Sequence, residues 1–438
     1  MSRNRTIFVG ALFGLMRLAA PDKAAAKPAL LVLSKAENTL AVVDPDSLAV
    51  VKKVPVGEGP HEVCVSADAR LAFVANYGNQ TPGNTISVID LDAGKELRRA
   101  DLGPLTRPHG LYESNGKVYF TTETSCAIAR YDHAADKVDW VVGTGQAGTH
   151  MLTVDESLGR IYTTNLGSDS VTIIDALGPA QGPGPKPVTV TVNKQPEGLA
   201  LSPDGKELWV APRQGGELVI IDTAADRVKE KIPYKGAAFR LHFTPDGKRV
   251  LAPDLPNGEV AVIDAATRKE EKRIQVAQAP IGTVVTPDSR RAFVACAGAN
   301  KVIVLDLEKL AVAGTIDAGK APDGMTWAEP RAPKTARKPG MLGVAVAPLN
   351  DEARGEAQVA ADVEGILIGN VNPNSPAAQA GLEVGDVILT INGTKVSDPQ
   401  KFAQMINRGR AGDVFTFEVL RAGQRVTEEV TLAERPGS

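Results

Sequence analysis

The chain of 438 residues carries 49 Lys and Arg side chains against 52 Asp and Glu side chains, which gives a formal net charge of −3 at pH 7. Its 43% hydrophobic and 23% charged content is ordinary for globular protein, and the length is sufficient for two or three domains. A slightly negative chain offers no overall basic surface of the kind that binding to a phosphate backbone requires. We therefore expect no nucleic-acid partner.

Residues 1–26 differ in composition from the rest of the chain. Arg3 and Arg5 precede an apolar run over Ile7–Met16, and a run of three alanines follows. This order is typical of a secretory signal peptide, so the sequence predicts a periplasmic or secreted protein. An uncleaved, frayed N-terminus is the alternative, because Arg17 interrupts the apolar region. No segment reaches the roughly 20 apolar residues of a transmembrane helix, so no membrane span is expected.

The three cysteines, Cys64, Cys126 and Cys296, form no Cys-x-x-Cys pair. An odd number leaves at least one thiol unpaired, so a disulfide framework is not indicated. Each cysteine lies in a strand-like stretch, and we expect all three to be buried as small apolar side chains.

A turn tetrapeptide recurs at regular spacing in the middle of the chain. It reads Ser202-Pro203-Asp204-Gly205, Thr244-Pro245-Asp246-Gly247 and Thr286-Pro287-Asp288-Ser289, with a step of 42 residues between starts. Proline presets φ at the second turn position, and Asp and Gly accept the conformations that follow. Each tetrapeptide is therefore predicted to join two antiparallel strands.

Alignment on these turns gives seven equivalent strand starts, at His61, His109, His150, Glu197, Phe239, Ile281 and Asp323. Four short strands follow in each unit, such as Leu208–Ala211 and Glu217–Asp222 for the second and third strands of one unit. Units of about 42 residues with four strands are typical of propeller blades. The predicted fold class is therefore all-β, a seven-bladed β-propeller.

The two ends of the repeat array complement each other. Ala29–Val56 supplies three strands without a first, and Pro322–Trp327 supplies a first strand without the other three. Together they complete the seventh blade and join the ends of the ring, which leaves few unprotected sheet edges. We expect the propeller over residues 27–329, with the Gly/Pro-rich segment 178–187 as a longer loop within one blade.

Short motifs recur within these units, namely Phe73-Val74-Ala75-Asn76 and Tyr162-Thr163-Thr164-Asn165, with Pro-His-Gly at 108–110 and Pro-Glu-Gly at 196–198. Through them the region resembles the YVTN family of β-propellers. The resemblance implies the fold but selects no function, because propellers host binding, scaffolding and several chemistries.

Apolar periodicity stops at the end of the propeller. Residues 330–338 combine proline with Arg331, Lys334, Arg337 and Lys338, which is typical of a charged, semi-extended linker. Contact of this basic run with an acidic surface is the alternative to a solvated spacer.

A second, smaller unit is predicted beyond the linker. Ser375–Gly381 has an N-cap serine, a proline at the first helical position and a closing glycine, which predicts a short helix. Gly385–Gly393 predicts a strand between two turns, and Asp398–Asn407 predicts a second helix. Alternating aromatic and aliphatic residues from Phe415 to Val419 begin a final strand pair.

Three segments, Gly340–Val344, Ser375–Leu382 and Gly385–Asn392, are similar to the PDZ domain attached to HtrA-type bacterial serine proteases. The resemblance covers residues 339–434 and implies that the first segment is the loop whose backbone N–H groups receive a peptide's C-terminus. A turn of free amides forms an anion-binding nest, and the exposed strand after it can accept a peptide as an added strand. The residues expected to form this groove are Met341, Leu342, Gly343, Val344, Ala345, Val346, Phe402, Met405 and Ile406. Alternatively, at least one of the last three fills the small core.

Proteolysis is not implied by this resemblance. The sequence contains no Gly-x-Ser-x-Gly elbow, no Gly-Asn-Ser-Gly-Gly segment and no trypsin-like domain. No catalytic residue is assigned.

His61, His109 and His150 occupy the same repeat position in consecutive units, and Glu197 and Asp323 occupy equivalent positions. In a propeller such strand starts ring one mouth of the central channel. Imidazoles with carboxylates suit Zn, Cu, Ni or Fe, so a divalent transition metal is the one cofactor considered, although none is firmly indicated. In the alternative interpretation, Pro-His-Gly is an ordinary strand-entry turn whose imidazole packs or bonds to nearby backbone.

Two further residues near the fifth strand start, Arg240 and His242, could add charge to the channel or be structural.

The sequence leaves two functions from different classes. The first is an exported interaction scaffold, in which the propeller surface and the PDZ groove capture C-termini or extended segments of other proteins. The alternative is a propeller enzyme, either a metal-dependent oxidoreductase or a lactonase-like hydrolase, with its site at the channel mouth and the PDZ domain for recruitment. The oligomeric state stays open.

Overall fold

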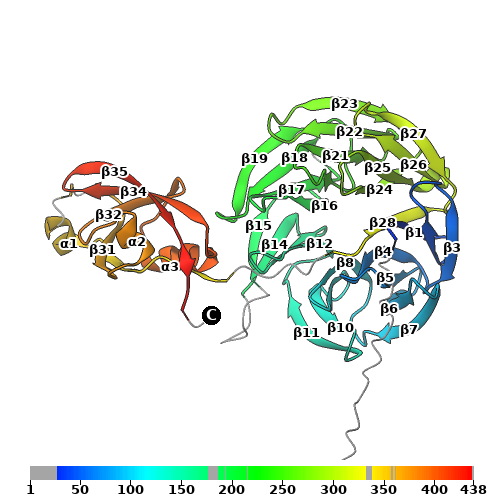
Figure 1. The fold of residues 1–438 in the computed structure, drawn as a ribbon, viewed down its shortest axis with the longest axis horizontal. Helices are drawn as coiled ribbons and strands as arrows, with labels where there is room; N and C mark the ends of the chain where they lie inside the picture. The colour runs from blue at the N-terminus through cyan, green and yellow to red at the C-terminus, as the bar shows by residue number, and fades with distance from the viewer. Residues whose placement is uncertain are drawn as a thin grey trace, which may run out of the picture.

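The computed structural model describes residues 27–175, 186–192, 194–214, 216–331, 338–356, 359–360 and 362–436. The predicted signal peptide and most of the 178–187 loop and the 330–338 linker lie outside the described residues. The described chain forms a ring of four-stranded antiparallel sheets and a smaller unit beside it (Figure 1).

Six of the sheets in the described residues consist of consecutive strands, as expected for propeller blades. They are β4–β7 (Pro60–Val65, Leu71–Gly78, Pro82–Asp90, Lys95–Asp101), β8–β11 (Pro108–Ser114, Lys117–Thr122, Ala127–Asp132, Lys137–Gly143), β12–β15 (Thr149–Asp155, Arg160–Asn165, Ser170–Asp175, Val188–Thr191), β16–β19 (Pro196–Leu201, Glu207–Pro212, Glu217–Asp222, Arg227–Pro233), β20–β23 (His242–Phe243, Arg249–Asp254, Glu259–Asp264, Glu270–Gln275) and β24–β27 (Pro280–Val285, Arg291–Cys296, Lys301–Asp306, Ala311–Ile316). A short 3-10 turn, η1 (Ala297–Ala299), follows β25.

The seventh sheet joins the two ends of the ring. Strand β28 (Pro322–Ala328) pairs with β1 (Ala29–Ser34), and β2 (Thr39–Val43) and β3 (Val50–Pro55) complete the sheet. The pairing is antiparallel and places Leu30 opposite Trp327. The predicted seven-bladed fold is therefore confirmed, including the way in which it closes.

The predicted turns carry a repeated side-chain bond. The hydroxyl of Thr244 donates to Asp246 Oδ1 at 2.6 Å, and the backbone N–H of Gly247 donates to the Thr244 carbonyl at 2.8 Å. Ser202 makes the equivalent bond to Asp204 at 2.7 Å. The hydroxyl and the carboxylate thus hold the turn closed, as the Ser/Thr-Pro-Asp pattern predicts.

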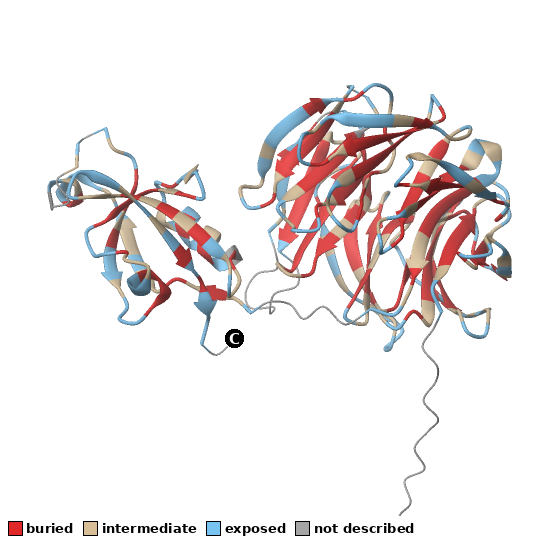
Figure 2. Cartoon of the chain, turned by 45° about the horizontal axis from the view of Figure 1, so that its top comes forward, coloured by how far each residue is buried: buried red, intermediate tan, exposed pale blue. Residues whose placement is uncertain are grey.

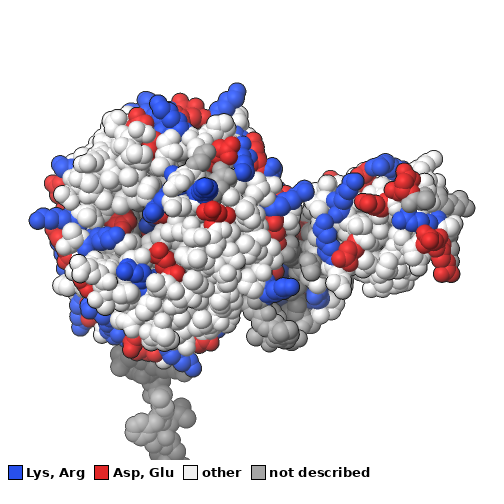
Figure 3. All heavy atoms as spheres, turned by 180° about the vertical axis from the view of Figure 1, so that it is seen from behind, with Lys and Arg blue, Asp and Glu red and all other residues white. Residues whose placement is uncertain are grey.

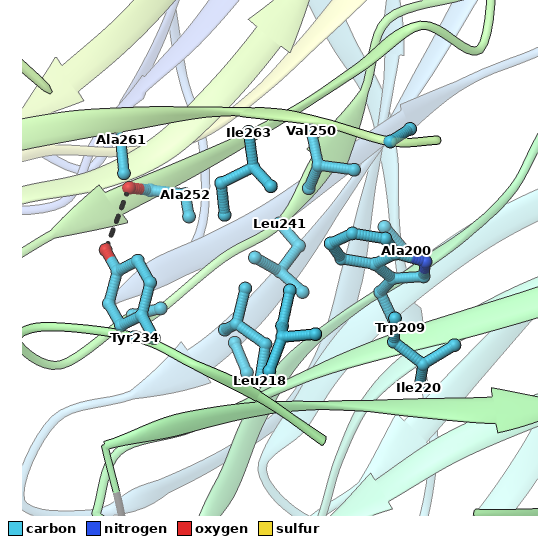
Figure 4. Packing of buried hydrophobic residues seen from close by; sticks show 14 of the residues in the cluster. Ala200, Trp209, Leu218, Ile220, Tyr234, Leu241, Val250, Ala252, Ala261 and Ile263 are labelled. Atoms are coloured by element: carbon cyan, nitrogen blue, oxygen red, sulfur yellow. Dashed lines mark hydrogen bonds between the residues drawn. The ribbon is translucent and has the colours of Figure 1, made fainter. Parts of the chain in front are cut away.

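Adjacent blades pack face to face through apolar side chains. Between the fourth and fifth complete blades, Trp209, Leu241 and Val250 belong to one buried cluster (Figure 4). Tyr234 lies in the same cluster, and its hydroxyl donates to the Ala252 carbonyl at 3.1 Å. Burial is greatest on the inner strands, and the outermost strands carry the exposed residues (Figure 2). Sheets buried on both faces explain why the inner strands are continuous apolar runs.

Arginine side chains, of which Arg160 is buried, join neighbouring blades as well. Arg160 in β13 has a side chain that is 2% exposed and binds Asp226 of the next blade at 2.7 Å. Its guanidinium also donates to the Thr223 carbonyl of that blade. Arg249 and Arg291 donate in the same way to Leu307 and Pro45, at 2.7 Å and 2.6 Å. Each guanidinium therefore satisfies a carbonyl at a turn of the following blade.

The smaller unit is built on an antiparallel sheet of β30–β35, and β29 and β36 form a separate two-stranded sheet. Its strands are β29 (Gly340–Met341), β30 (Val344–Pro348), β31 (Ile366–Val371), β32 (Val387–Ile391), β33 (Thr394–Lys395), β34 (Val414–Arg421), β35 (Gln424–Thr431) and β36 (Ala433–Glu434), and its helices are α1 (Asp351–Glu356), α2 (Pro376–Gln379) and α3 (Pro399–Arg408). Both predicted helices are present with their predicted caps. Ser375 Oγ accepts from the Ala378 N–H at 3.2 Å, and Asp398 accepts from the Gln400 N–H at 2.8 Å.

All three cysteines are free thiols. Cys64 and Cys296 are buried, whereas Cys126 is only partly buried. The expectation of three buried cysteines is wrong for Cys126, which lies in the turn before β10 with φ of 51° rather than inside a strand.

Replacing Arg160 with alanine tests the role of the buried arginines. Because the substitution leaves the Asp226 carboxylate, 6% exposed, without its guanidinium, we expect the free energy of unfolding to fall by about 3 kcal/mol. Arg99→Ala is the matched control. The Arg99 side chain pairs with Glu96 but is 43% exposed, so its loss should lower the free energy of unfolding by less than about 1 kcal/mol. Chemical denaturation followed by circular dichroism measures both, and equal small losses would contradict the assignment.

Candidate functional site

The seven aligned strand starts converge on one pocket. His61, His109, His150, Glu197, Phe239, Ile281 and Asp323 all line a hollow of about 340 Å³. They come from the innermost strands of the blades, which contact one another around the ring. The hollow therefore lies at one mouth of the channel, and the structure brings together all five residues considered as metal ligands.

A second set of lining residues was missed by the sequence analysis. It consists of Lys35, Tyr77, Glu123, Leu166, Arg213 and Leu255. Each directly follows the end of the second-strand segment that pairs with an innermost strand start, as Tyr77 follows Asn76 opposite Pro60. Aligning the ends of the second strands, as well as the starts of the first, would have identified them.

The three histidines form a row. The ring centroids of His61 and His109 are 4.9 Å apart, and those of His109 and His150 are 3.8 Å apart. Tyr77 stacks on His61 with centroids 4.4 Å apart. His109 is 2% exposed, and its Nδ1 has no hydrogen-bond partner within the described chain.

The outer two histidines have different partners. His61 Nδ1 lies 3.1 Å from the Gly59 carbonyl and so carries the proton, which leaves Nε2 to accept from Lys35 Nζ at 2.7 Å. His150 Nε2 lies 3.1 Å from Glu197 Oε1, and its Nδ1 lies 3.7 Å from Glu123 Oε2. His61 is thus held neutral between a carbonyl and an ammonium, and His150 lies between two carboxylates.

The pKa values of the row follow from these surroundings. Burial opposes the charged form of His150, yet its bond to Glu197 and the nearby Glu123 carboxylate raise its pKa above the ordinary value. Burial lowers the pKa of His61 to about 4 and, together with the charge on His150, holds the pKa of His109 well below its usual range. Despite burial, the His150 bond lowers the pKa of Glu197 to about 2. The carboxylates therefore favour the charged form of His150, whereas burial favours the neutral forms of His61 and His109.

Arg240 lies at the centre of the mouth. Its guanidinium pairs with Glu62 and lies 3.6 Å from Glu197 and 3.7 Å from Asp323, which belong to three other blades. The Arg240 side chain is only 12% exposed. The sequence analysis left this residue as either a source of channel charge or structural, and these contacts give it both roles. His242 in β20 is not among the pocket residues; burial lowers its pKa to about 4.

The side chains of the mouth do not form a metal-binding geometry. Among the residues that the structure describes, no group of three or more His, Cys, Asp or Glu side chains could hold a metal ion. The nitrogen atoms of His61 and one of those of His150 are already directed to other partners. The bond from His61 to Gly59 matches the alternative interpretation of the Pro-His-Gly turn. Transition-metal binding stays a prediction from the residue types alone.

The predicted peptide groove has an open edge. Strand β30 lies at the end of the sheet order and pairs only with β31 among the described strands. In the loop before it, the N–H groups of Leu342 and Gly343 donate to no acceptor in the described chain, although both carbonyls are bonded. Gly343 has φ of +86°, and a Cβ atom there would lie 2.3 Å from Ser375 Cβ. The loop can take this shape only with glycine, and it presents two consecutive amides.

The remaining predicted groove residues fall into different environments. Val344 and Val346 are half-buried and pack on the core of the unit, and Ala345 between them is exposed. Phe402 and Ile406 are buried at 5% and 7% exposure within that core, so the core-filling alternative applies to them. Met405 differs, because it lines a separate hollow with Asn392 and Phe415 that includes no residue of β30.

Charge on the surface is mixed in sign. Figure 3 shows acidic and basic side chains interspersed over the face that it presents. In the part of the chain that the structure describes, no helix has the length and apolar content needed to cross a bilayer.

Comparison with known proteins identifies the smaller unit. The family model described as PDZ domain matches residues 340–432. A probable periplasmic serine endoprotease, DegP-like, from Halomonas elongata is 32% identical over 99 residues, which cover 23% of this chain and 21% of that protein. The chain spans about a fifth of the length of the curated relatives it matches.

Solved structures match the propeller. A functionally unknown protein from Desulfotomaculum acetoxidans has a TM-score of 0.59 at 11% identity, over 69% of this chain and 99% of that one. A putative 6-phosphogluconolactonase from Bacteroides fragilis has a TM-score of 0.58 at 15% identity, over 70% and 99%. Likeness at this identity shows the fold alone. The YVTN resemblance stays a prediction.

Replacing His150 with glutamine tests its charged state. Since its pKa is raised in the folded protein, the stabilisation from His150 is complete below the ordinary pKa of 6.5 and is lost as the pH rises through the folded value. We expect the variant to be about 2 kcal/mol less stable than the wild type at low pH, with a gap that narrows as pH rises.

The matched control is His133→Gln. Burial lowers the pKa of His133, so protonation of His133 destabilises the folded protein. The difference in stability between wild type and His133→Gln should therefore not narrow as the pH rises. Denaturant midpoints across neutral and alkaline pH measure both variants. A constant gap for His150→Gln would show that folding does not raise the pKa of His150.

Proposed function

We propose that this chain is an exported interaction protein whose PDZ domain captures the C-terminus of another protein. The observation that carries the proposal is the pair of free amides at Leu342 and Gly343 beside the unpaired edge of β30. A carboxylate accepts from such amides, and the chain that bears it adds to the sheet edge as a strand.

The chemistry of the strand favours an apolar peptide end. Val344 and Val346 lie on the side of β30 that packs on the core, and the neighbouring helix α3 contributes Phe402 and Ile406 to the same apolar cluster. The side chain of a terminal residue bound at the amides would enter this environment. Because such strand-addition interfaces are small, binding should be weak and exchangeable.

The propeller supplies a rigid second surface. Its blades are held by apolar clusters and by arginine bonds between neighbours, so its turns form a fixed platform. If one partner contacts both units, the second contact is intramolecular and overall affinity rises without a tighter groove.

A periplasmic or secreted location is part of this proposal. It rests on the basic and apolar pattern of residues 1–26 and on the printed name of the Halomonas relative, which is a periplasmic protein. The endoprotease activity in that name does not come to this chain, since the matched part covers 21% of the relative.

No observation in the described part of the chain specifically favours the enzyme alternative. A metal-dependent oxidoreductase or a lactonase-like hydrolase would use the channel mouth, and the lactonase name among the similar structures accompanies a likeness of fold. It stays a prediction.

Peptide binding to the full chain tests the proposal. We expect fluorescent peptides with an apolar last residue and a free carboxylate to bind, and the same peptides with an amidated end to bind at least roughly tenfold more weakly. Fluorescence anisotropy measures both. Equal binding of the two forms would replace C-terminal capture with recognition of an extended internal segment.

Gly343→Ala should weaken binding by a similar factor, because its Cβ meets Ser375 and its φ is positive. Gly355→Ala is the control, since no atom lies within 4 Å of a Cβ there and its φ is ordinary. Loss of binding in both variants would indicate general damage to the domain.

A further inference from the structure

The channel-mouth pocket contains buried polar groups that its own residues leave open. The Asp323 side chain is 6% exposed and lies 3.7 Å from both Lys35 Nζ and Arg240 Nη2. Both distances exceed hydrogen-bond length, so the carboxylate keeps acceptor capacity. His109, at 2% exposure, has an Nδ1 with no partner there. Both residues line the pocket, so an acceptor and an imidazole are available to a ligand.

A donor stands beside them. Lys35 Nζ donates to His61, and an ammonium carries three N–H groups, so Lys35 has further donors to offer. Its side chain is 37% exposed and reaches the pocket from the rim. Lys35 as donor, Asp323 as acceptor and the His109 imidazole, which can donate or accept, thus line the same small pocket.

The charged side chains around the pocket are paired with one another. Lys35 lies against Asp323, Arg213 against Glu197 and Arg240 against Glu62, and His150 lies between Glu123 and Glu197. Arg213 Nε lies 2.7 Å from Glu197 Oε2, and Tyr77 donates to Glu123 at 2.6 Å. An added ion would need a counter-charge that the pocket already uses internally, because unpaired buried charge is costly. The chemistry therefore suits a ligand that is polar but uncharged.

One side of the pocket is apolar. Phe239, Leu255 and Ile281 come from adjacent blades and line the hollow opposite the histidine row. A ring with hydroxyl groups at its edge and C–H groups on its faces would satisfy both walls. The volume of about 340 Å³ is at the small end of the range for ligand pockets.

We propose that the channel mouth binds a small neutral polyol, such as a pyranose sugar or a cyclitol. One hydroxyl donates to the Asp323 carboxylate and accepts from Lys35, and a second bonds to His109. This site is independent of the peptide groove, and neither proposal requires the other.

Titration calorimetry of the full chain tests the site with D-glucose, D-galactose and myo-inositol as neutral probes. D-Gluconate and D-glucosamine serve as the anionic and cationic counterparts. We expect saturable binding of at least one neutral probe, and binding of both charged probes roughly tenfold or more weaker. No saturable binding by any neutral probe would overturn the proposal, as would tighter binding of gluconate or glucosamine.

Two variants locate the binding. Asp323→Asn should weaken it by roughly tenfold, and Lys35→Met, on a half-exposed side chain that the fold can lose, by severalfold. His133→Gln, outside the pocket, should leave it unchanged. If Asp323→Asn fails to fold, Lys35→Met still decides the matter. Unchanged affinity in the variants that fold would place the ligand elsewhere and overturn the assignment.

Discussion

The structure of the propeller depends on the pairing of β1 with β28. Leu30 and Trp327 come from opposite ends of the repeat array and meet in one sheet. Without this pairing β1 and β28 would each expose a row of unpaired backbone groups, and the ring of innermost strands would stay open. The ring in turn fixes the position of the seven strand starts, and the channel-mouth pocket exists only because those starts face one another.

The two candidate sites achieve recognition in different ways. The groove of the PDZ domain leaves main-chain groups open, at Leu342 and Gly343, and depends little on which side chains surround them. The channel mouth instead depends on side chains from separate blades, where Arg240 and His150 are compensated by carboxylates. As proposed, the first arrangement would accept many partners that share a chain end, and the second would select by the placement of individual hydrogen bonds.

Much of this architecture could be predicted from sequence because it repeats. The 42-residue step of the Pro-Asp turns fixed the blade count, and Ser375 and Asp398 marked both predicted helices. The convergence of His61, His109 and His150 also followed from alignment. Their chemistry did not, because the pKa of His150 is raised by Glu123, which lies outside the aligned position, and by Glu197, which lies far from it in sequence. The environment of Met405 could not be predicted for a similar reason, since helical spacing does not say which neighbour covers each side of α3.

The closing strand also sets the order of events as the chain is made. Leu30 is among the earliest residues of the propeller to leave the ribosome, and its partner Trp327 is among the last. For that whole interval β1 has an open edge. The ring closes only through the pairing of β1 with β28, and a contact of such long sequence separation slows folding. A chain of this design has to keep its first strand from pairing with other chains until almost all of the propeller has been synthesised. The PDZ domain, encoded after β28, emerges only when the ring is ready to close.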